Sequence, residues 1–212
     1  IWITNQLEYS SCTGWATAGA LSRSRFFRGI SDMAILSGSF IYSLINGGRD
    51  QGSPLEDALR VVEQYGAPLA SLVGPTMIFP RLQPKNARDE AAKHRGLEAY
   101  RALTKEGWDT GLACGYMGIG VVHAGNRFVK MTQISTGTSC SVRAGVDSGL
   151  PGNHAVLICD IRYIGGTLHY LLDNTWGLRG WGSRGRAWVT WESFEATFNN
   201  HCFFLIPSSQ EK

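Results

Sequence analysis

The strongest constraint on the fold of this 212-residue chain is a change in sequence pattern near residue 107. Before it, apolar residues recur at helical spacing, and we predict a mostly buried helix, a second helix and a charged surface helix at residues 12–27, 55–65 and 86–103. After it, β-branched and aromatic runs between glycines predict strands at 118–123, 128–134, 155–163, 168–172 and 187–191. We therefore expect an α+β chain in which a mainly helical lobe, residues 1–108, packs on a mainly β lobe, residues 109–212, with a cleft between them.

The composition is that of an ordinary globular protein, with 43% hydrophobic and 17% charged residues and a formal net charge of +3. Its arginines form two groups that we interpret as solvated faces, because neither is the sustained basic run typical of nucleic-acid binding. The groups are Arg23, Arg25 and Arg28, and Arg179, Arg184 and Arg186. No apolar stretch reaches the roughly 20 residues that cross a bilayer. We expect a soluble, enzyme-sized unit with neither nucleic-acid nor membrane partners.

The five cysteines show no spacing typical of a zinc site or of a small disulfide-stapled domain, and we predict no metal and no cofactor. Cys114 and Cys159 lie beside apolar residues, which predicts that both are buried as small hydrophobic side chains. Cys12 differs, because it follows two serines at the predicted start of a helix.

A cysteine at a helix start can be a nucleophile or a core residue, and position alone does not decide between them. The nucleophilic form is the thiolate, a minor form of a free cysteine near neutral pH. We expect the helix N-terminus and a neighbouring imidazolium to lower the pKa of Cys12.

Gln6 stands six positions before Cys12, and the run from residue 4 to residue 16 resembles the nucleophile region of the papain family of cysteine peptidases. That resemblance implies that the Gln6 side-chain amide and the Cys12 backbone N–H form an oxyanion hole. Two such preorganised donors can each contribute about 3 kcal/mol to stabilising the transition state.

Among the five histidines, only His154 opens a strongly apolar run, residues 155–158, after a turn-like segment. The stretch is similar to the family's histidine motif, in which Asn or Asp precedes His-Ala-Val. The resemblance implies that His154 transfers the proton and that Asn153 beside it contacts substrate. We expect His94 to be solvated, and His169 and His201 to face solvent or pack in the sheet.

Residues 171–177, followed by Gly-Trp-Gly at 180–182, form the most specific pattern in the chain. They resemble the family's Asn-Ser-Trp-Gly and Gly-Trp-Gly run, with Thr175 in place of serine. By that resemblance Asn174 hydrogen-bonds the imidazole, and Trp176 shields the bond and borders the substrate. A neutral amide fixes the ring without adding a negative charge that would oppose a thiolate.

Residues 36–66 are similar to the helical-lobe stretch in which glycines line the cleft. We place the substrate-pairing backbone at Gly52, with Gln51 beside it, and keep Gly47-Gly48 as the alternative. The resemblance covers nearly the whole chain. It implies a papain-like two-lobed fold, in which a helical lobe and an antiparallel β-barrel-like lobe enclose the active-site cleft.

Two departures from the family pattern bear on the compartment in which the protein works. Thr13 and Gly14 separate the nucleophile from Trp15, as in bacterial and phage-type members, and Tyr9 replaces a cysteine that forms a helical-lobe disulfide. This favours a reducing environment or a virion over secretion. Cys140 and Cys202 occupy places that resemble a sheet-lobe disulfide, but the longer spacing before His154 leaves their pairing open.

The sequence thus predicts a cysteine endopeptidase that acts on peptides through a Cys-His-Asn triad and an acyl-enzyme. Because the chain begins at Ile1 and enters a motif at once, we expect a processed product or a piece of a longer polypeptide, with an upstream pro-segment as a possible partner. Two alternatives stay open. One is a papain-like domain of a larger phage virion assembly with latent or lost activity, and the other is a thiol amidase or transglutaminase.

Overall fold

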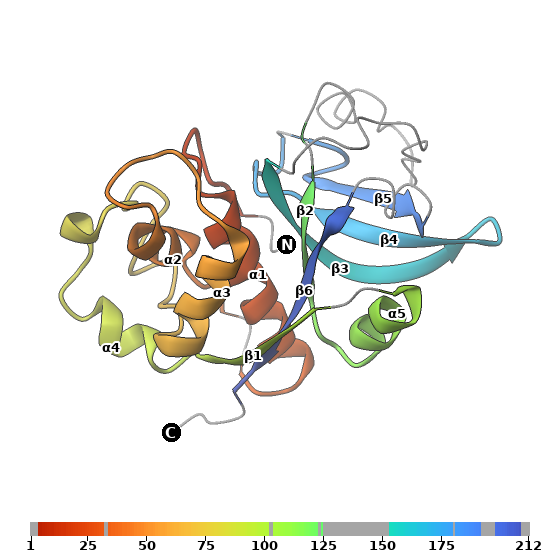
Figure 1. Cartoon of the computed structure of the whole chain (residues 1–212), viewed down its shortest axis with the longest axis horizontal. Helices are drawn as coiled ribbons and strands as arrows, with labels where there is room; N and C mark the ends of the chain where they lie inside the picture. Colours follow the sequence, from red (N-terminus) through yellow and green to blue (C-terminus); the bar gives the residue numbers. More distant parts are fainter. Residues whose placement is uncertain are drawn as a thin grey trace.

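The structure is a computed structural model that describes residues 4–31, 34–101, 104–122, 124, 153–179, 181–191 and 198–208. The helices that precede β1 lie on one side of the molecule, and the sheet with α5 lies on the other (Figure 1). In chain order the elements are α1 (Cys12–Phe27), α2 (Gly38–Ile45), α3 (Leu55–Gln64), η1 (Pro80–Leu82), α4 (Ala87–Ala91), β1 (Gly96–Arg101), α5 (Lys105–Ala113), β2 (Gly118–Val122), β3 (His154–Ile164), β4 (Thr167–Asp173), β5 (Arg186–Thr190) and β6 (Phe198–Pro207).

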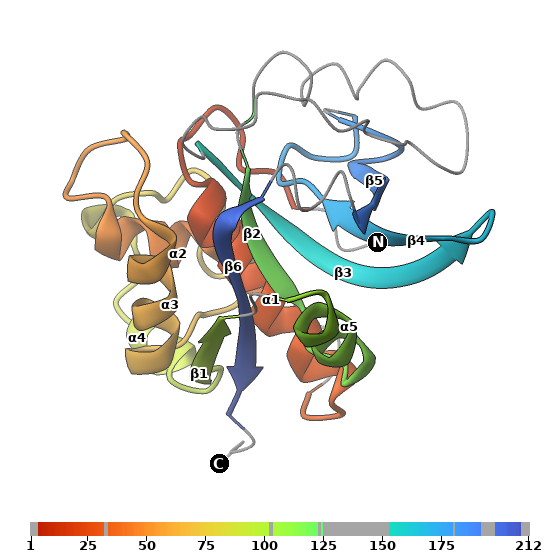
Figure 2. The same ribbon diagram turned by 45° about the vertical axis from the view of Figure 1, so that its right-hand side comes forward.

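Helix α1 is the central element, and the helices predicted at 12–27 and 55–65 are confirmed as α1 and α3. One side of α1 packs on α2 so closely that a Cβ atom added to Gly14 would lie 2.3 Å from the Gly38 carbonyl oxygen. The crossing therefore requires glycine at position 14. Another side packs on the sheet, mainly along β3 and β6 and less along β2 (Figure 2). There Ala16 and Leu21 share a buried cluster with Ile119 and Leu157.

The six strands form one antiparallel sheet in the order β1-β6-β2-β3-β4-β5. The predicted strands that fall within the described residues are confirmed as β2 to β5, whereas residues 128–134 lie outside them. The α+β class is confirmed. Among the described residues the strand order is linear, with β1 and β5 as the two outermost strands.

The prediction of a helix at residues 86–103 was wrong for most of that range. Within residues 86–101, the described part of this range, only α4 is helical. The chain then enters β1, which pairs with β6 from Gly96 opposite Pro207 to Arg101 opposite Phe203. Pairing with a strand about a hundred residues later overrides the local preference of a charged segment. As a result β1 belongs to the sheet, and residue 108 lies inside α5.

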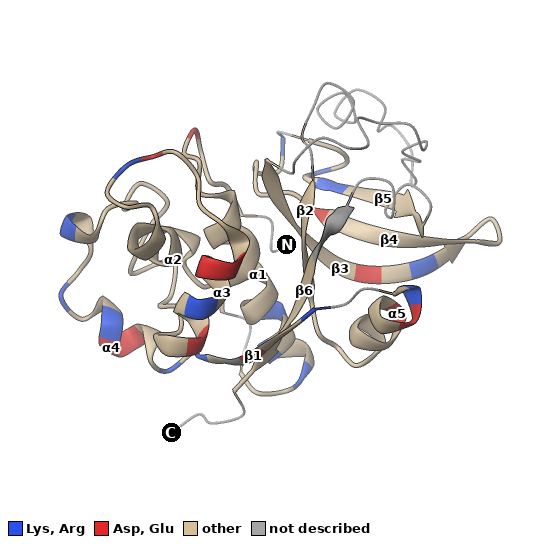
Figure 3. Ribbon diagram, in the orientation of Figure 1, with Lys and Arg blue, Asp and Glu red and all other residues tan. Residues whose placement is uncertain are grey.

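The interpretation of Arg23 and Arg25 as solvated was also wrong, because their exposed fractions are 4% and 1%. Arg23 forms an ion pair with Asp173, and Arg25 Nη1 donates to the Ser208 carbonyl at 3.4 Å. Elsewhere charges of both signs alternate along the helices, as on α3 and α4 (Figure 3). No described helix combines the length and apolar character that a membrane crossing requires.

The cysteine predictions have mixed outcomes. Cys159 is half-buried, but Cys114 is exposed because it caps the C-terminal end of α5, so its predicted burial was wrong. Cys202 is a buried free thiol. Cys140, the partner considered for it, lies outside the described residues.

Candidate active site

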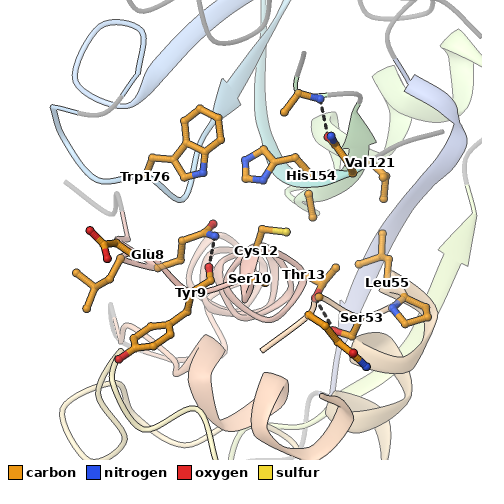
Figure 4. A pocket seen from close by; sticks show the side chains of 18 of the residues that line it. Glu8, Tyr9, Ser10, Cys12, Thr13, Ser53, Leu55, Val121, His154 and Trp176 are labelled. Carbon is orange, nitrogen blue, oxygen red and sulfur yellow. Dashed lines mark hydrogen bonds between the residues drawn. The ribbon is translucent and has the colours of Figure 1, made fainter. Parts of the chain in front are cut away.

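Cys12 is the first residue of α1 and lines a cleft of about 850 Å³ at the junction of the helices and the sheet. The helix begins after Ser11, whose carbonyl accepts the first hydrogen bond of α1 from Trp15 N–H at 3.1 Å. Figure 4 shows Cys12 at the end of α1, with His154 opposite it on the sheet side. A residue of each half of the chain therefore reaches the same cleft.

His154 is the first residue of β3 and is 5% exposed. Its Nε2 lies 2.7 Å from Asn174 Oδ1. The Trp176 ring lies over the imidazole at a centroid distance of 4.6 Å and an interplanar angle of 31°. The tryptophan covers the ring as the resemblance implied, and the hydrogen bond is buried.

The orientation of the Asn174 amide fixes the tautomer of His154. Asn174 Oδ1 also accepts from the Thr175 backbone N–H at 2.7 Å, so it is the amide oxygen that faces the imidazole. Nε2 must then carry a proton and donate it. In the neutral ring this leaves the lone pair on Nδ1, the nitrogen that can take a proton from a thiol.

Gln6 is 6% exposed, and both the nitrogen and the oxygen of its side-chain amide form hydrogen bonds. Its Nε2 donates to the Tyr9 carbonyl at 2.6 Å, and its Oε1 accepts a short hydrogen bond from the Thr175 hydroxyl. Its backbone N–H donates to the Thr175 carbonyl at 2.8 Å. The hydroxyl therefore decides which end of the amide presents N–H groups.

Thr175 is the site residue that the sequence interpretation missed. It was noted only as a replacement for serine, yet a hydroxyl beside Asn174 is the one feature that serine and threonine share. That shared hydroxyl was the signal for the contact with Gln6.

The pKa shifts of Cys12 and His154 differ from those expected from the sequence. Burial raises the pKa of Cys12, and backbone hydrogen bonds from Ala155, Thr13 and Cys12 itself lower it by less. Burial lowers the pKa of His154 to about 4, against the opposing effect of the Asn174 hydrogen bond. The pKa of the thiol is thus raised and not lowered as expected, because desolvation outweighs the backbone hydrogen bonds to Cys12. Both shifts favour a neutral thiol beside a neutral imidazole, from which an ion pair forms by moving one proton.

The lowered pKa of His154 predicts acid sensitivity of the fold. Between pH 6.5 and about 4 the unfolded histidine is protonated while the buried one is not, so stability falls as pH falls through this window. In a Cys12→Ala variant, which has no thiolate to pair with the ring, we expect a loss of about 3 kcal/mol from pH 7 to 4. Denaturant unfolding at several pH values measures it. The Cys12→Ala/His154→Gln variant is the control, and parallel curves for the two would contradict the prediction.

All four predicted substrate-binding residues, Gln51, Gly52, Asn153 and Trp176, line the cleft. Gly52 has a φ of 82°, and its N–H donates to the Tyr42 hydroxyl at 3.1 Å. Asn153 Oδ1 accepts from the Ala124 N–H at 2.7 Å. The described cleft lining does not include the alternative glycines, Gly47 and Gly48.

Of the other histidines, His94 and His169 lie outside this cleft lining, whereas His123 and the His201 side chain are not among the described parts of the structure. His169 packs in β4 with 6% exposed and its Nδ1 2.8 Å from the Thr167 carbonyl. The His94 side chain is only 15% exposed, so its predicted solvation was wrong. Among the described residues no three His, Cys, Asp or Glu side chains gather as they would around a metal ion.

Comparisons with known proteins agree with this geometry at the level of the fold. No family model matches the sequence, and no curated protein matches it. Solved structures do match. The cysteine protease CMS1MS2 of Carica candamarcensis superposes with a TM-score of 0.75 at 16% identity, over 98% of this chain and 92% of that one. Xylellain, a cysteine protease from Xylella fastidiosa, gives 0.73 at 21% identity, over 97% and 82%.

A precursor structure matches as well. Digestive procathepsin L 3 from the larval midgut of Tenebrio molitor gives a TM-score of 0.74 at 16% identity, and this chain spans 66% of its length. The chain thus has the α+β papain-like fold, in which an N-terminal helical portion packs against an antiparallel six-stranded sheet. Its fold is that of papain-like cysteine proteases.

Proposed function

We propose that this protein is a cysteine peptidase in which Cys12 is the nucleophile, His154 the proton carrier and Asn174 the residue that orients the imidazole. The observation that carries the proposal is the 2.7 Å contact between His154 Nε2 and Asn174 Oδ1 beside the cleft that Cys12 lines. A buried, oriented imidazole opposite a thiol at a helix start is the arrangement that thiol acyl transfer requires.

The reaction proceeds in two steps. As the Cys12 sulfur attacks the peptide carbonyl carbon, its proton passes to His154 Nδ1 and the carbonyl oxygen becomes an oxyanion. The Cys12 backbone N–H and Gln6 Nε2–H donate to that oxyanion. His154 then gives the proton to the leaving amine, the C–N bond breaks, and water activated by His154 hydrolyses the thioester.

The substrate peptide lies extended across the cleft. Trp176 and Glu8 lie on one side of Cys12, and Leu55 and Val121 on the other (Figure 4). Because the Gly52 N–H is donated to Tyr42, Gly52 pairs with substrate through its carbonyl oxygen, with Gln51 beside it. Asn153 borders the same cleft next to His154.

Labelling with an epoxide-type thiol reagent tests the nucleophile. We expect one adduct per chain, located at Cys12 by peptide mapping, and a matching loss of peptide hydrolysis. Cys114 is the internal control, because it is exposed but lies outside the cleft lining. Labelling of Cys114 in folded protein with Cys12 unmodified would defeat the proposal.

A substrate panel separates this function from its rivals. Cleavage of a mixed peptide library supports a peptidase, whereas release of products only from peptidoglycan fragments supports an amidase, and amine incorporation into glutamine supports a transglutaminase. A folded protein that does none of these supports the latent virion domain. An upstream pro-segment as a partner of this chain belongs to the same proposal.

The Gln6 amide gives a separate quantitative prediction. We expect Gln6→Ala to lower kcat/KM on a peptide by about 100-fold to 1000-fold, because one of two oxyanion donors is lost. Steady-state kinetics measures it, with Gln64→Ala, an exposed glutamine at the end of α3, as the matched control. An equal, small effect of both substitutions would remove Gln6 from the oxyanion hole.

A further inference from the structure

A buried ion pair connects the helix that carries Cys12 to the strand that leads to Asn174. Asp173 is the last residue of β4 and directly precedes Asn174, and its exposed fraction is 3%. The Arg23 guanidinium, from α1, lies within ion-pair distance of Asp173 Oδ2, and the two side chains are 5% and 3% exposed. A carboxylate buried to this degree is costly unless it is paired.

Arg186 completes the cluster from the opposite side. It is the cross-strand partner of Asp173 in the β4–β5 ladder, with Nε 3.0 Å from Oδ1 and Nη2 donating to Oδ2 at 3.1 Å. Figure 3 shows the acidic end of β4 beside the basic start of β5. Cys159 adjoins the cluster at an irregularity in the β3–β4 register, and burial raises its pKa, so the thiol adds no further charge.

The two ends of the Arg23–Asp173 pair are rigidly connected to the two sides of the active site. Arg23 follows Cys12 by eleven residues in one continuous helix, which is three turns and a rotation of only about 20°, so both residues lie on nearly the same face of α1. At the other end, Asp173 is bonded to Asn174, whose amide oxygen holds the His154 ring. The pair therefore links the position of the thiol to the position of the imidazole.

We propose that Arg23 and Asp173 are positioning residues, which set the placement of α1 against β4 and thereby the alignment of Cys12 with His154. This inference rests on the proposed function. Neither residue lines the cleft, so neither contacts substrate, and each acts through its neighbour in the chain. A displacement of reacting atoms by about 1 Å can cost about 100-fold in rate.

The kinetic test is a double-mutant cycle of Arg23→Gln and Asp173→Asn. We expect each single variant to lose about 100-fold in kcat with KM nearly unchanged, because substrate contacts are intact. The double variant should be no slower than the slower single variant, since both substitutions break one unit. Arg60→Gln is the matched control, because its ion pair with Asp57 is on the surface and far more exposed.

A second readout separates positioning from a general loss of stability and does not depend on peptidase activity. The imidazole nitrogen and Nε2–H signals of His154, followed by NMR in folded protein, report its hydrogen bond to Asn174. We expect Asp173→Asn to move these signals and Arg60→Gln to leave them in place. Unchanged His154 signals in folded Asp173→Asn protein would overturn the proposal.

Failure of the proposed function and failure of the positioning role give different results. Absence of hydrolysis in the wild-type protein counts against the proposed function, whereas the His154 signals still test the positioning role. If Asp173→Asn does not fold, Arg23→Lys carries the test, because lysine keeps the charge but cannot present a planar guanidinium to the carboxylate. A shifted His154 signal in that variant supports the proposal, and an unchanged one overturns it.

Discussion

A Cys12→Ser variant is expected to lose peptide hydrolysis by at least about 10⁴-fold in kcat, because it lacks the thiolate that attacks the carbonyl. The fold should be unaffected, since oxygen replaces sulfur in a half-buried side chain at the start of α1. Progress curves on a fluorogenic peptide measure the rate, and thermal unfolding checks the fold.

Cys114→Ser is the control for this substitution, because it makes the same chemical change at an exposed thiol outside the cleft lining. It should retain full activity. Hydrolysis by Cys12→Ser at a rate close to wild type, in protein free of contaminating peptidase, would show that another group is the nucleophile.

A His154→Gln variant should lose about 10³-fold to 10⁴-fold in kcat/KM, because His154 is the one imidazole in the described lining of the cleft and glutamine can neither take the thiol proton nor return it to the leaving amine. Glutamine can still hydrogen-bond to Asn174, so the loss reports proton transfer more than packing. The same variant should react slowly with an epoxide reagent at neutral pH.

His169→Gln is the matched control, because His169 is similarly buried, at 6% exposed, and lies in β4 away from the cleft lining. Its activity should stay near that of the wild type. If the two histidine variants lost the same amount of activity, the effect would be one of stability and His154 would not be the proton carrier.

Local patterns in the sequence were enough to predict much of the fold and to select residues that the structure places around one cleft. The many small and apolar residues of α1 and the apolar runs that become β3 and β4 are signals within single segments of the sequence, so these elements were found. The structure places Gln6 and His154 in the lining of one cleft, with His154 hydrogen-bonded to Asn174 and Gln6 to Thr175.

Features that depend on long-range pairing were not predictable in the same way. The charged segment that becomes β1 has no strand signal of its own, and its conformation is decided by β6. Arg23 and Arg25 resembled a solvated group because nothing near them in sequence supplies an acceptor. Their acceptors, Asp173 and the Ser208 carbonyl, lie 150 and 183 residues further along the chain.

The pKa shifts of Cys12 and His154 were unpredictable for the same reason, because they depend on packing between segments that are distant in the sequence. A helix start suggests a stabilised thiolate, but the degree of desolvation depends on how β3 covers the thiol, and only the packed structure supplies it.

The chain crosses between the two halves of the molecule at both ends. Residues near the start bond to the loop after β4, through Gln6 N–H to the Thr175 carbonyl and Gly177 N–H to the Thr4 carbonyl. Near the other end, β6 pairs with β1. Two fragments produced by cutting between β1 and α5 would each lack partners for their backbone, so neither should fold alone. Mixed together they should reassemble, which makes this scaffold suitable for split-protein complementation.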